Sequence, residues 1–369
     1  MIRLEKVSKV YPDGTEAVKE VSFEVDKGVL CVLLGPSGCG KTTTMKMINR
    51  LIPITSGNIY VDGMDITAIN EDEFRRNIGY AIQEIGLFPH MTVSQNIEIV
   101  PALKGWAKAK RRKRAEELLE LVGMAPEEFA DKYPTELSGG QCQRVGVARA
   151  LGADPPILLM DEPFGAIDPI TREKLQNEFL RIQETIKKTI IFVTHDIYEA
   201  IKMADRIALM KEGRLVQYDT PTNLLYRPKD EFVANFVGAD RALKGLQLIR
   251  VKEVMRGSPP TVKIDEKAIA AKQRIEQERI DQLVVVDDDG KFLGWLSRLD
   301  WERGETVRDI MRPSSVVATA NTVLNEALSL MLSSGLMTLA VVNSDNSLEG
   351  VLSFDDIRKG LSEVSRESE

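Results

Sequence analysis

The chain has 369 residues, of which 43% are hydrophobic and 28% are charged, and its formal net charge is −7. This length predicts two or three domains, and the acidic balance argues against nucleic acid as a general partner. Three scattered cysteines favour a reducing compartment over a disulfide framework. The first residues lack the apolar core of a signal peptide, and no apolar run reaches the roughly 18 residues of a membrane span.

Three short apolar runs are typical of parallel strands that are buried on both faces. They are Val29–Gly35, Ile157–Pro163 and Thr189–Asp196, and each ends in polar residues. Because helical stretches lie between them, we expect an α/β domain with its ligand at the carboxyl ends of the strands. Residues 90–151 should form an inserted helical subdomain, and residues 206–221 a hairpin that turns at Glu212 and Gly213.

A glycine-rich loop follows the first apolar run. GPSGCGKT, Gly35–Thr42, fits the pattern G-x-x-x-x-G-K-[ST], in which backbone amides and a helix start hold phosphate oxygens. Lys41 should reach the β- and γ-phosphates, and Thr42 should ligand Mg²⁺. The predicted nucleotide contacts of this loop are Gly35, Pro36, Ser37, Gly38, Cys39, Gly40, Lys41, Thr42 and Thr43.

Polar residues at the ends of the other apolar runs are candidates for catalysis. Asp161 should hold Mg²⁺ or its water, and Glu162 should activate or position the attacking water. His195 is expected to sense the γ-phosphate and to orient Glu162. Gln83 should reach Mg²⁺ and the water on one side and a moving subdomain on the other. Tyr11 could stack on adenine or be an ordinary strand aromatic.

Two stretches of the helical region carry further signals. The basic run Lys108–Arg114 opens a helix, and we favour a solvated helix face over contact with an anionic membrane. Ser138 and the glycines after it stand directly before an apolar-periodic helix. This helix start is suited to an anion, so the chain has a second phosphate cradle.

The order and spacing of these motifs resemble those of ABC-transporter ATPase domains, from Met1 to about Gly238. The resemblance implies a homodimer in which each ATP lies between one P-loop and the cradle of the other subunit. In that arrangement Asp168 links the two sites, and the γ-phosphate is bound by Ser138, Gly139, Gly140 and Gln141. Cys142 stands where the family usually has Gln, and Ile167 where Leu is usual. Cys39 and Cys142 lie near helix starts, which can lower a thiol pKa.

An internal duplication fills the C-terminal part. Met255 and Met311 are 56 residues apart, and Gly294 and Gly350 keep the same offset. Each copy predicts a helix, an apolar strand, and a second strand that leads into a helix. Copies of this size are too small to bury a core alone, so we expect them to pack on each other.

The duplication resembles a tandem CBS pair, a module that commonly binds adenine nucleotides. The resemblance makes two Ser–Asp pairs candidate ribose or phosphate contacts, namely Ser297 with Asp300 and Ser353 with Asp356. Helix capping explains such residues equally well. The pair could be a sensor of an adenine nucleotide of the cyclic di-adenosine type, or a dimerisation clamp that reads ionic strength.

The whole chain resembles the ATP-binding subunits of compatible-solute importers. The predicted fold is a P-loop NTPase domain of ABC ATPase type with an inserted helical subdomain, followed by an α+β tandem CBS pair. The expected parts are 1–238 (ATPase), 239–250 (linker), 251–306 and 307–362 (CBS repeats) and 363–369 (tail). The resemblance implies ATP and Mg²⁺, a membrane permease, a substrate-binding protein, and a place at the cytoplasmic face of the membrane. The alternatives are import of another small solute and a non-transport ABC ATPase.

Overall fold

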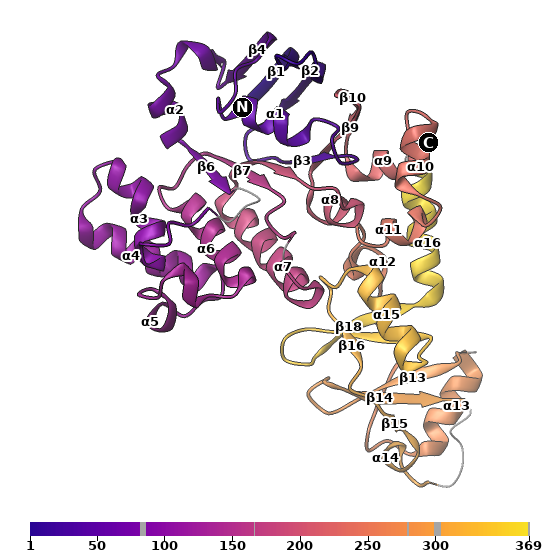
Figure 1. The fold of residues 1–369 in the computed structure, drawn as a ribbon. Coiled ribbons are helices and arrows are strands. Elements are labelled where there is room, and N and C mark those ends of the chain that lie inside the picture. The colour runs from indigo at the N-terminus through magenta and orange to yellow at the C-terminus, as the bar shows by residue number, and fades with distance from the viewer. Residues whose placement is uncertain (82–85, 166, 279, 299–303, 368–369) are drawn as a thin grey trace. The chain divides into compact units, whose positions relative to one another are not determined.

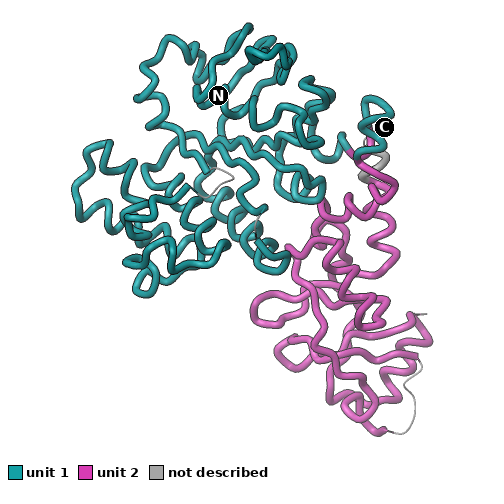
Figure 2. The backbone as a smooth tube through the Cα atoms, viewed as in Figure 1, with its two compact units in different colours: residues 1–224, 228–236 teal, residues 225–227, 237–369 magenta. Residues whose placement is uncertain are grey.

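The computed structural model describes residues 1–81, 86–165, 167–278, 280–298 and 304–367. The chain divides into two compact units, which are described separately (Figure 2). Unit 1 comprises residues 1–224 and 228–236, and unit 2 comprises residues 225–227 and 237–369. The functional division into residues 1–238 and 251–362 remains a prediction.

The described part of unit 1 contains two sheets (Figure 1). The smaller is antiparallel, with the strand order β2-β1-β4-β5. Its strands are β1 (Ile2–Val10), β2 (Glu16–Val25), β4 (Ser56–Val61) and β5 (Met64–Asp65). The larger sheet has the order β10-β9-β3-β8-β7-β6, with strands β3 (Leu30–Leu34), β6 (Ile78–Ala81), β7 (Ile157–Asp161), β8 (Thr189–Val193), β9 (Arg206–Lys211) and β10 (Arg214–Asp219).

The three predicted core strands are confirmed. β3, β7 and β8 are fully buried along their five residues each, and β8 pairs in parallel with both of the others. Parallel strands buried on both faces need continuous apolar runs, which is the sequence pattern that predicted them. Their carboxyl ends therefore lie at one edge of the sheet. The predicted hairpin is also confirmed, because β9 and β10 are antiparallel and Glu212 and Gly213 both have positive φ.

The helices of unit 1 connect these strands or form the predicted helical subdomain. The connecting helices are α1 (Lys41–Ile48), α2 (Glu71–Arg76), α7 (Pro169–Ile186) and α8 (Ile197–Met203). The subdomain contains α3 (Val93–Leu103), α4 (Lys108–Leu121), α5 (Pro126–Phe129) and α6 (Gly139–Leu151). α9 (Pro221–Tyr226) and α10 (Glu231–Val237) follow β10.

Several side chains of the basic run at the start of α4 form local ion pairs or a cation–π contact. Arg112 forms ion pairs with Glu116 and Asp131, and the Arg111 guanidinium lies 3.3 Å from Glu98. The Lys110 ammonium lies over the Trp106 ring. These pairings fit the solvated helix face that we favoured from the sequence.

Unit 2 repeats the same elements at an offset of 56 residues. The first copy contains α12 (Val251–Val254), β11 (Arg256–Gly257), β12 (Thr261–Lys263), α13 (Ala268–Glu278), β13 (Gln282–Val286) and β14 (Phe292–Ser297). The second contains α14 (Val307–Ile310), β15 (Arg312–Pro313), β16 (Val317–Ala318), α15 (Leu324–Ser334), β17 (Thr338–Val342), β18 (Leu348–Ser353) and α16 (Phe354–Glu367). α11 (Arg241–Gly245) precedes both copies.

The two copies pack on each other, as the sequence predicted. One apolar cluster contains Trp295 and Phe292 of the first copy together with Val342 and Val351 of the second. The copies also exchange strands, which the sequence did not reveal. β11 of the first copy pairs with β18, and β15 of the second pairs with β14. Each four-stranded sheet is therefore completed by a two-residue strand from the other copy.

Candidate functional site

The glycine-rich loop joins β3 to α1 and depends on glycine at two points. A Cβ atom on Gly35 would lie 2.2 Å from the carbonyl oxygen of Met210, and one on Gly40 would lie 2.4 Å from that of Ala17. Both residues also have positive φ, which other residues rarely adopt. Gly38 has positive φ too, but a Cβ placed on it would meet no atom of the described residues within 4 Å apart from its chain neighbours. The loop backbone thus packs closely on its inner side and has room at Gly38.

Lys41 lies inside the loop. Its ammonium donates hydrogen bonds to the carbonyl oxygens of Gly35 at 2.7 Å and of Pro36 at 3.0 Å, and the residue is only 6% exposed. The ammonium is therefore held by oxygen atoms of the loop that it belongs to. Phosphate oxygens are stronger partners for an ammonium than neutral carbonyls, so a bound anion could take over these contacts.

Thr42 and Asp161 meet between α1 and the end of β7. The Thr42 hydroxyl donates to the Asp161 carboxylate over 3.1 Å, and Asp161 is buried. Burial raises the pKa of this carboxyl, an effect that the Thr42 hydrogen bond partly offsets. A hydroxyl and a carboxylate are the oxygen ligands that Mg²⁺ takes from proteins, with water and phosphate completing its shell. The pair fits the predicted metal site.

Glu162 and His195 meet one strand further along the same edge. His195 Nδ1 lies 3.1 Å from the Glu162 carboxylate. The backbone amide of Glu162 donates to the Val193 carbonyl, and its φ is +46°. A residue other than glycine in this region is strained, and such strain is concentrated at functional sites. The predicted partnership between His195 and Glu162 is therefore present in the geometry.

The other residues predicted to contact the nucleotide differ in exposure, and one of them is not described. Gln83 lies outside the described residues, two positions after the end of β6. Tyr11 directly follows β1, is partly exposed, and has the Lys9 ammonium 5.4 Å from its ring centroid. Ser37 is exposed and Thr43 is partly exposed. Adenine stacking on Tyr11 stays a prediction.

The second cradle is an exposed helix start. Ser138 caps α6: its hydroxyl accepts from the Gln141 amide, and the Gln141 side chain accepts from the Ser138 amide at 2.8 Å. Among the described residues, and apart from the neighbouring helix backbone, no atom lies within 4 Å of a Cβ placed on Gly139, and Ile167 alone reaches that distance from one on Gly140. Ser138 and Gly139 are exposed. The helix end therefore presents uncrowded amides and its positive dipole outward.

Asp168 is also a helix cap. Its carboxylate accepts from the Thr171 amide at the start of α7, and this hydrogen bond lowers the pKa of the Asp168 carboxyl. Asp168 is exposed, and the neighbouring Ile170 is 72% exposed. The turn at Asp168 thus combines an exposed anion with an exposed apolar side chain, a composition suited to a protein interface.

The structure corrects the expectation for the cysteines near helix starts. Burial raises the pKa of Cys39, although the Lys41 ammonium pulls in the opposite direction. Burial also raises the pKa of Cys142, whose thiol donates to the Pro134 carbonyl. The prediction that helix starts lower these thiol pKa values was wrong, because desolvation outweighs the helix dipole.

In unit 2, Ser353 and Asp356 bond to each other. The Asp356 carboxylate accepts from the Ser353 amide at 2.9 Å and from its hydroxyl at 2.5 Å, and the Arg256 guanidinium lies 3.1 Å away. Asp356 is only 6% exposed. These contacts favour the helix-cap alternative. Of the corresponding pair in the first copy, Ser297 ends β14 and Asp300 lies outside the described residues.

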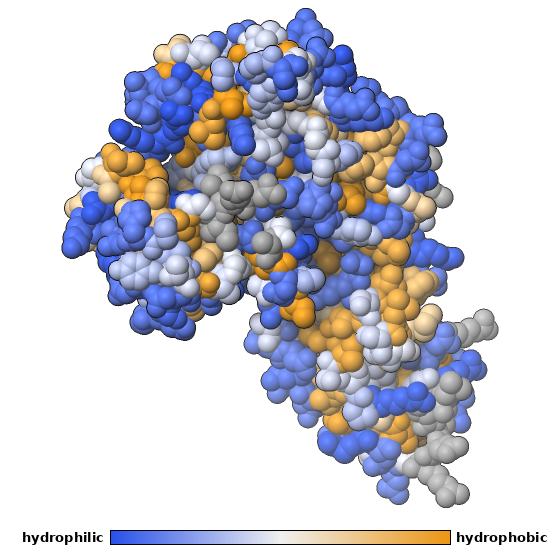
Figure 3. Space-filling view, in the orientation of Figure 1, coloured by the Kyte–Doolittle hydropathy of each residue, from blue (hydrophilic) through white to orange (hydrophobic). Residues whose placement is uncertain are grey.

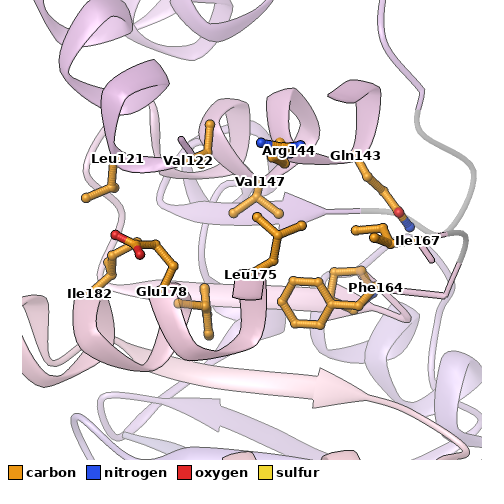
Figure 4. Close-up of a pocket in the computed structure, with 12 residues that line it drawn as sticks. Leu121, Val122, Gln143, Arg144, Val147, Phe164, Ile167, Leu175, Glu178 and Ile182 are labelled. Carbon is orange, nitrogen blue, oxygen red and sulfur yellow. The ribbon is translucent and has the colours of Figure 1, made fainter. Parts of the chain in front are cut away.

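A narrow, partly open hollow of about 20 Å³ lies between α6, α7 and the end of α4 (Figure 4). Its lining is mostly apolar, with Val147 of α6 facing Leu175 of α7 and with Phe164 and Ile167 from the segment after Glu162. The hollow lies between α6, the helix of the second cradle, and the segment that follows Glu162. We call the strand ends that carry Asp161, Glu162 and His195 the catalytic edge.

Comparisons with known proteins agree with these observations. The ABC transporter family matches residues 18–165, and the CBS domain family matches residues 251–301 and 307–363. A glycine betaine/carnitine/choline transport ATP-binding protein of Bacillus subtilis, OpuCA, is 48% identical over 95% of this chain and 94% of its own length. The osmoprotectant import ATP-binding protein OsmV of Salmonella typhimurium is 45% identical over 98% of this chain and 96% of its own.

The chain belongs to the ATP-binding subunits of ABC transporters. The solved structures agree: a dimer of the ATP-binding cassette MJ0796 bound to ADP and Pi has a TM-score of 0.56 and 36% identity, covering 60% of this chain and 99% of the cassette. The predicted family and fold are thereby confirmed, and the protein is a transport ATPase. Cassettes of this family form dimers and work with a membrane permease. Within the described residues of this chain, no helix is both long enough and apolar enough to cross a membrane.

Proposed function

We propose that this ABC subunit hydrolyses ATP to drive import of an osmoprotectant quaternary amine, such as glycine betaine, carnitine or choline. The observation that carries the solute class is similarity along nearly the whole length, CBS pair included, to subunits named for these solutes. The hydrolytic part rests on the catalytic edge, where Thr42–Asp161 and Glu162–His195 lie at the ends of adjacent strands.

Each polar group at this edge has a role in the proposal. Lys41 exchanges its loop carbonyls for the β- and γ-phosphates, and Thr42 and Asp161 hold Mg²⁺. A Mg²⁺ ion bound by these two residues would supply positive charge against the phosphate oxygens. Glu162 positions the attacking water and accepts its proton, and His195 keeps that carboxylate aimed at the water. Gln83 completes the contacts to water, and Tyr11 supports the adenine ring.

Two copies of the chain would complete each site. Ser138 and the amides of Gly139, Gly140 and Gln141 bind the γ-phosphate of the partner's nucleotide, and Asp168 lies at the junction of the two sites. ATP then stabilises the dimer, and loss of the γ-phosphate releases it. This use of the second cradle would explain why Ser138 and Gly139 are exposed in one chain.

The membrane partners follow from the same family. Figure 3 shows an apolar patch over α3. Leu103 at the end of this helix and Phe88 in the segment before it are both exposed. We assign this surface to contact with the permease. The subunit then works at the cytoplasmic face of the membrane, and a substrate-binding protein delivers the solute to the permease.

Solute uptake by cells tests the proposal. Strains would carry the native chain, its Glu162→Gln variant or neither, and uptake of labelled glycine betaine would be measured before and after a salt upshift. We expect salt-stimulated uptake with the native chain alone. Equal uptake in all three strains would overturn glycine betaine as the solute. The same assay with carnitine, choline, proline and another amino acid then separates the other osmolytes from a different small solute.

The CBS pair has a regulatory role in this proposal. An adenine nucleotide of the cyclic di-adenosine type would bind between the copies and change ATP turnover. The competing role is a dimerisation clamp that responds to ionic strength. Full-length Lys41→Ala protein, impaired in ATP binding at the P-loop, would be titrated with a nucleotide panel. Saturable binding of one nucleotide supports the sensor, and no binding together with salt-dependent self-association supports the clamp.

A further inference from the structure

A buried acidic side chain lies behind the loop that carries His195. Glu199 stands on α8, is only 8% exposed, and accepts a hydrogen bond from the Gln176 side chain of α7 at 2.9 Å. The Thr194 hydroxyl is near the same carboxylate and lowers its pKa as a hydrogen-bonding neighbour. Two donors from different elements thus converge on an acid that the hydrolytic roles above do not use.

Thr194 connects Glu199 to both sides of the His195 backbone. Thr194 is buried, and its amide donates to the Leu33 carbonyl at the end of β3. Its hydroxyl accepts from the Asp196 amide at 3.1 Å. Because that hydroxyl oxygen is already an acceptor toward Asp196, its single proton is free to point at Glu199. The residues before and after His195 are therefore fixed through one hydroxyl.

On its other side, Glu199 is connected through Gln176 and α7 to the segment before Asp168. Gln176 lies on α7, and the Arg172 guanidinium, one turn earlier, donates to the Ile167 carbonyl at 2.9 Å. Burial raises the pKa of Glu199, and nearby Asp196 adds to this effect, whereas Thr194, Gln176 and Arg172 oppose it. A buried carboxylate is unfavourable unless donors surround it, so these contacts are what keep Glu199 in place.

We propose that Glu199 is a positioning residue for ATP hydrolysis: through Thr194 it fixes His195 against Glu162, and through Gln176 it links that geometry to α7 and the turn at Asp168. The inference rests on the proposed roles of Glu162 and His195. Glu199 itself touches neither the reacting phosphate nor water. Its effect should therefore appear in the rate of the chemical step and not in ATP affinity.

The first measurement compares steady-state ATPase kinetics of Glu199→Met and Glu199→Gln. Met removes both acceptor contacts at similar size, so we expect kcat to fall by about tenfold or more with KM for ATP nearly unchanged. Gln should cost less, because its oxygen can still accept from Thr194. Glu173→Gln, an exposed acid on α7, is the matched control and should keep native kcat. The double exchange Gln176→Glu/Glu199→Gln restores a donor–acceptor pair and should recover much of the lost rate.

A double-mutant cycle with His195→Ala separates positioning from general stability. If Glu199 acts through His195, Glu199→Gln should lower kcat by less than about twofold once His195 is gone. Additive losses, a change in KM alone, or native kcat in Glu199→Met would each overturn the inference. Should Glu199→Met not fold, the Gln variant and the double exchange still decide it. Glu162→Gln is measured in parallel: if it retains turnover, the proposed function has failed, whereas native kcat in the Glu199 variants alone refutes only this inference.

Discussion

The polar pairs of the two units are built in different ways. In unit 1, Thr42 contacts Asp161 and Glu162 contacts His195, so each pair joins residues from separate elements, 119 and 33 positions apart. In unit 2, Ser353 and Asp356 are three positions apart at one strand–helix junction. The first kind of pair exists only when the sheet has formed, whereas the second forms wherever a helix starts. A Ser–Asp spacing is therefore weak evidence for a ligand site, and convergence at strand ends is stronger evidence.

Replacement of Glu162 tests this difference most severely. In Glu162→Gln the side chain keeps its shape but can no longer take a proton, so kcat for ATP should fall by roughly 10² to 10⁴-fold. ATP binding should persist, since Lys41 and the glycine-rich loop are unchanged. Radioactive phosphate release and equilibrium ATP binding measure the two properties. His90→Gln, on an exposed loop, is the control, and turnover near the native rate in Glu162→Gln would remove Glu162 from its proposed role.

The strand exchange in unit 2 can be tested through two glycines that face each other. Gly257 and Gly350 are paired between β11 and β18. A Cβ on Gly350 would lie 2.6 Å from the Arg256 carbonyl, whereas one on Gly257 would meet no atom of the described residues within 4 Å apart from its chain neighbours. Gly350→Ala should lower the free energy of unfolding by about 1–3 kcal/mol. Gly257→Ala should change it by no more than about 0.5 kcal/mol. Denaturant unfolding of the two full-length variants checks the contrast, and equal losses would argue against the pairing.

The cap at Asp356 should have a smaller effect. Asp356→Ala removes the acceptor for the Ser353 amide, a loss of about 0.5–2 kcal/mol for a capping side chain. The ion pair adds little, because the Arg256 side chain is 63% exposed and solvent screens it. Denaturant unfolding measures the loss, and Asp355→Ala, an exposed neighbour, is the control. A native free energy of unfolding in Asp356→Ala would mean that the cap is not what holds this acid in place.

Most of the fold of unit 1 could be predicted from the sequence, because several independent patterns each indicate one of its elements. The apolar run at Leu30–Leu34, the glycine pattern after it and the helix start at Ser138 each predict a local structure that the fold confirms. The two-residue strands were missed, because Arg256 pairs with Val351, 95 positions away, and so short a segment has no periodicity. Glu199 was missed for a related reason. Its position four residues after His195 was visible, but its burial and its partner Gln176 depend on tertiary packing.

Cys39 allows the effect of a helix start on a thiol pKa to be compared with the effect of burial. Cys39 is only 3% exposed, and burial raises its pKa above the ordinary 9.0. The rate of alkylation by a thiol reagent should therefore keep rising with pH beyond 9, without the plateau of a free thiol. The protonated thiol is the form that folding favours, so the stability from Cys39 is complete below the ordinary pKa and is lost as pH rises through the folded value. Mass spectrometry of full-length protein over a pH series measures the rate, with Cys39→Ser to assign the site. A plateau below pH 9 would restore the helix-start interpretation.

Labelled protein should also lose ATP binding, because a bulky group on Cys39 would fill the loop that Lys41 now occupies. Native ATP affinity after complete labelling would refute that prediction.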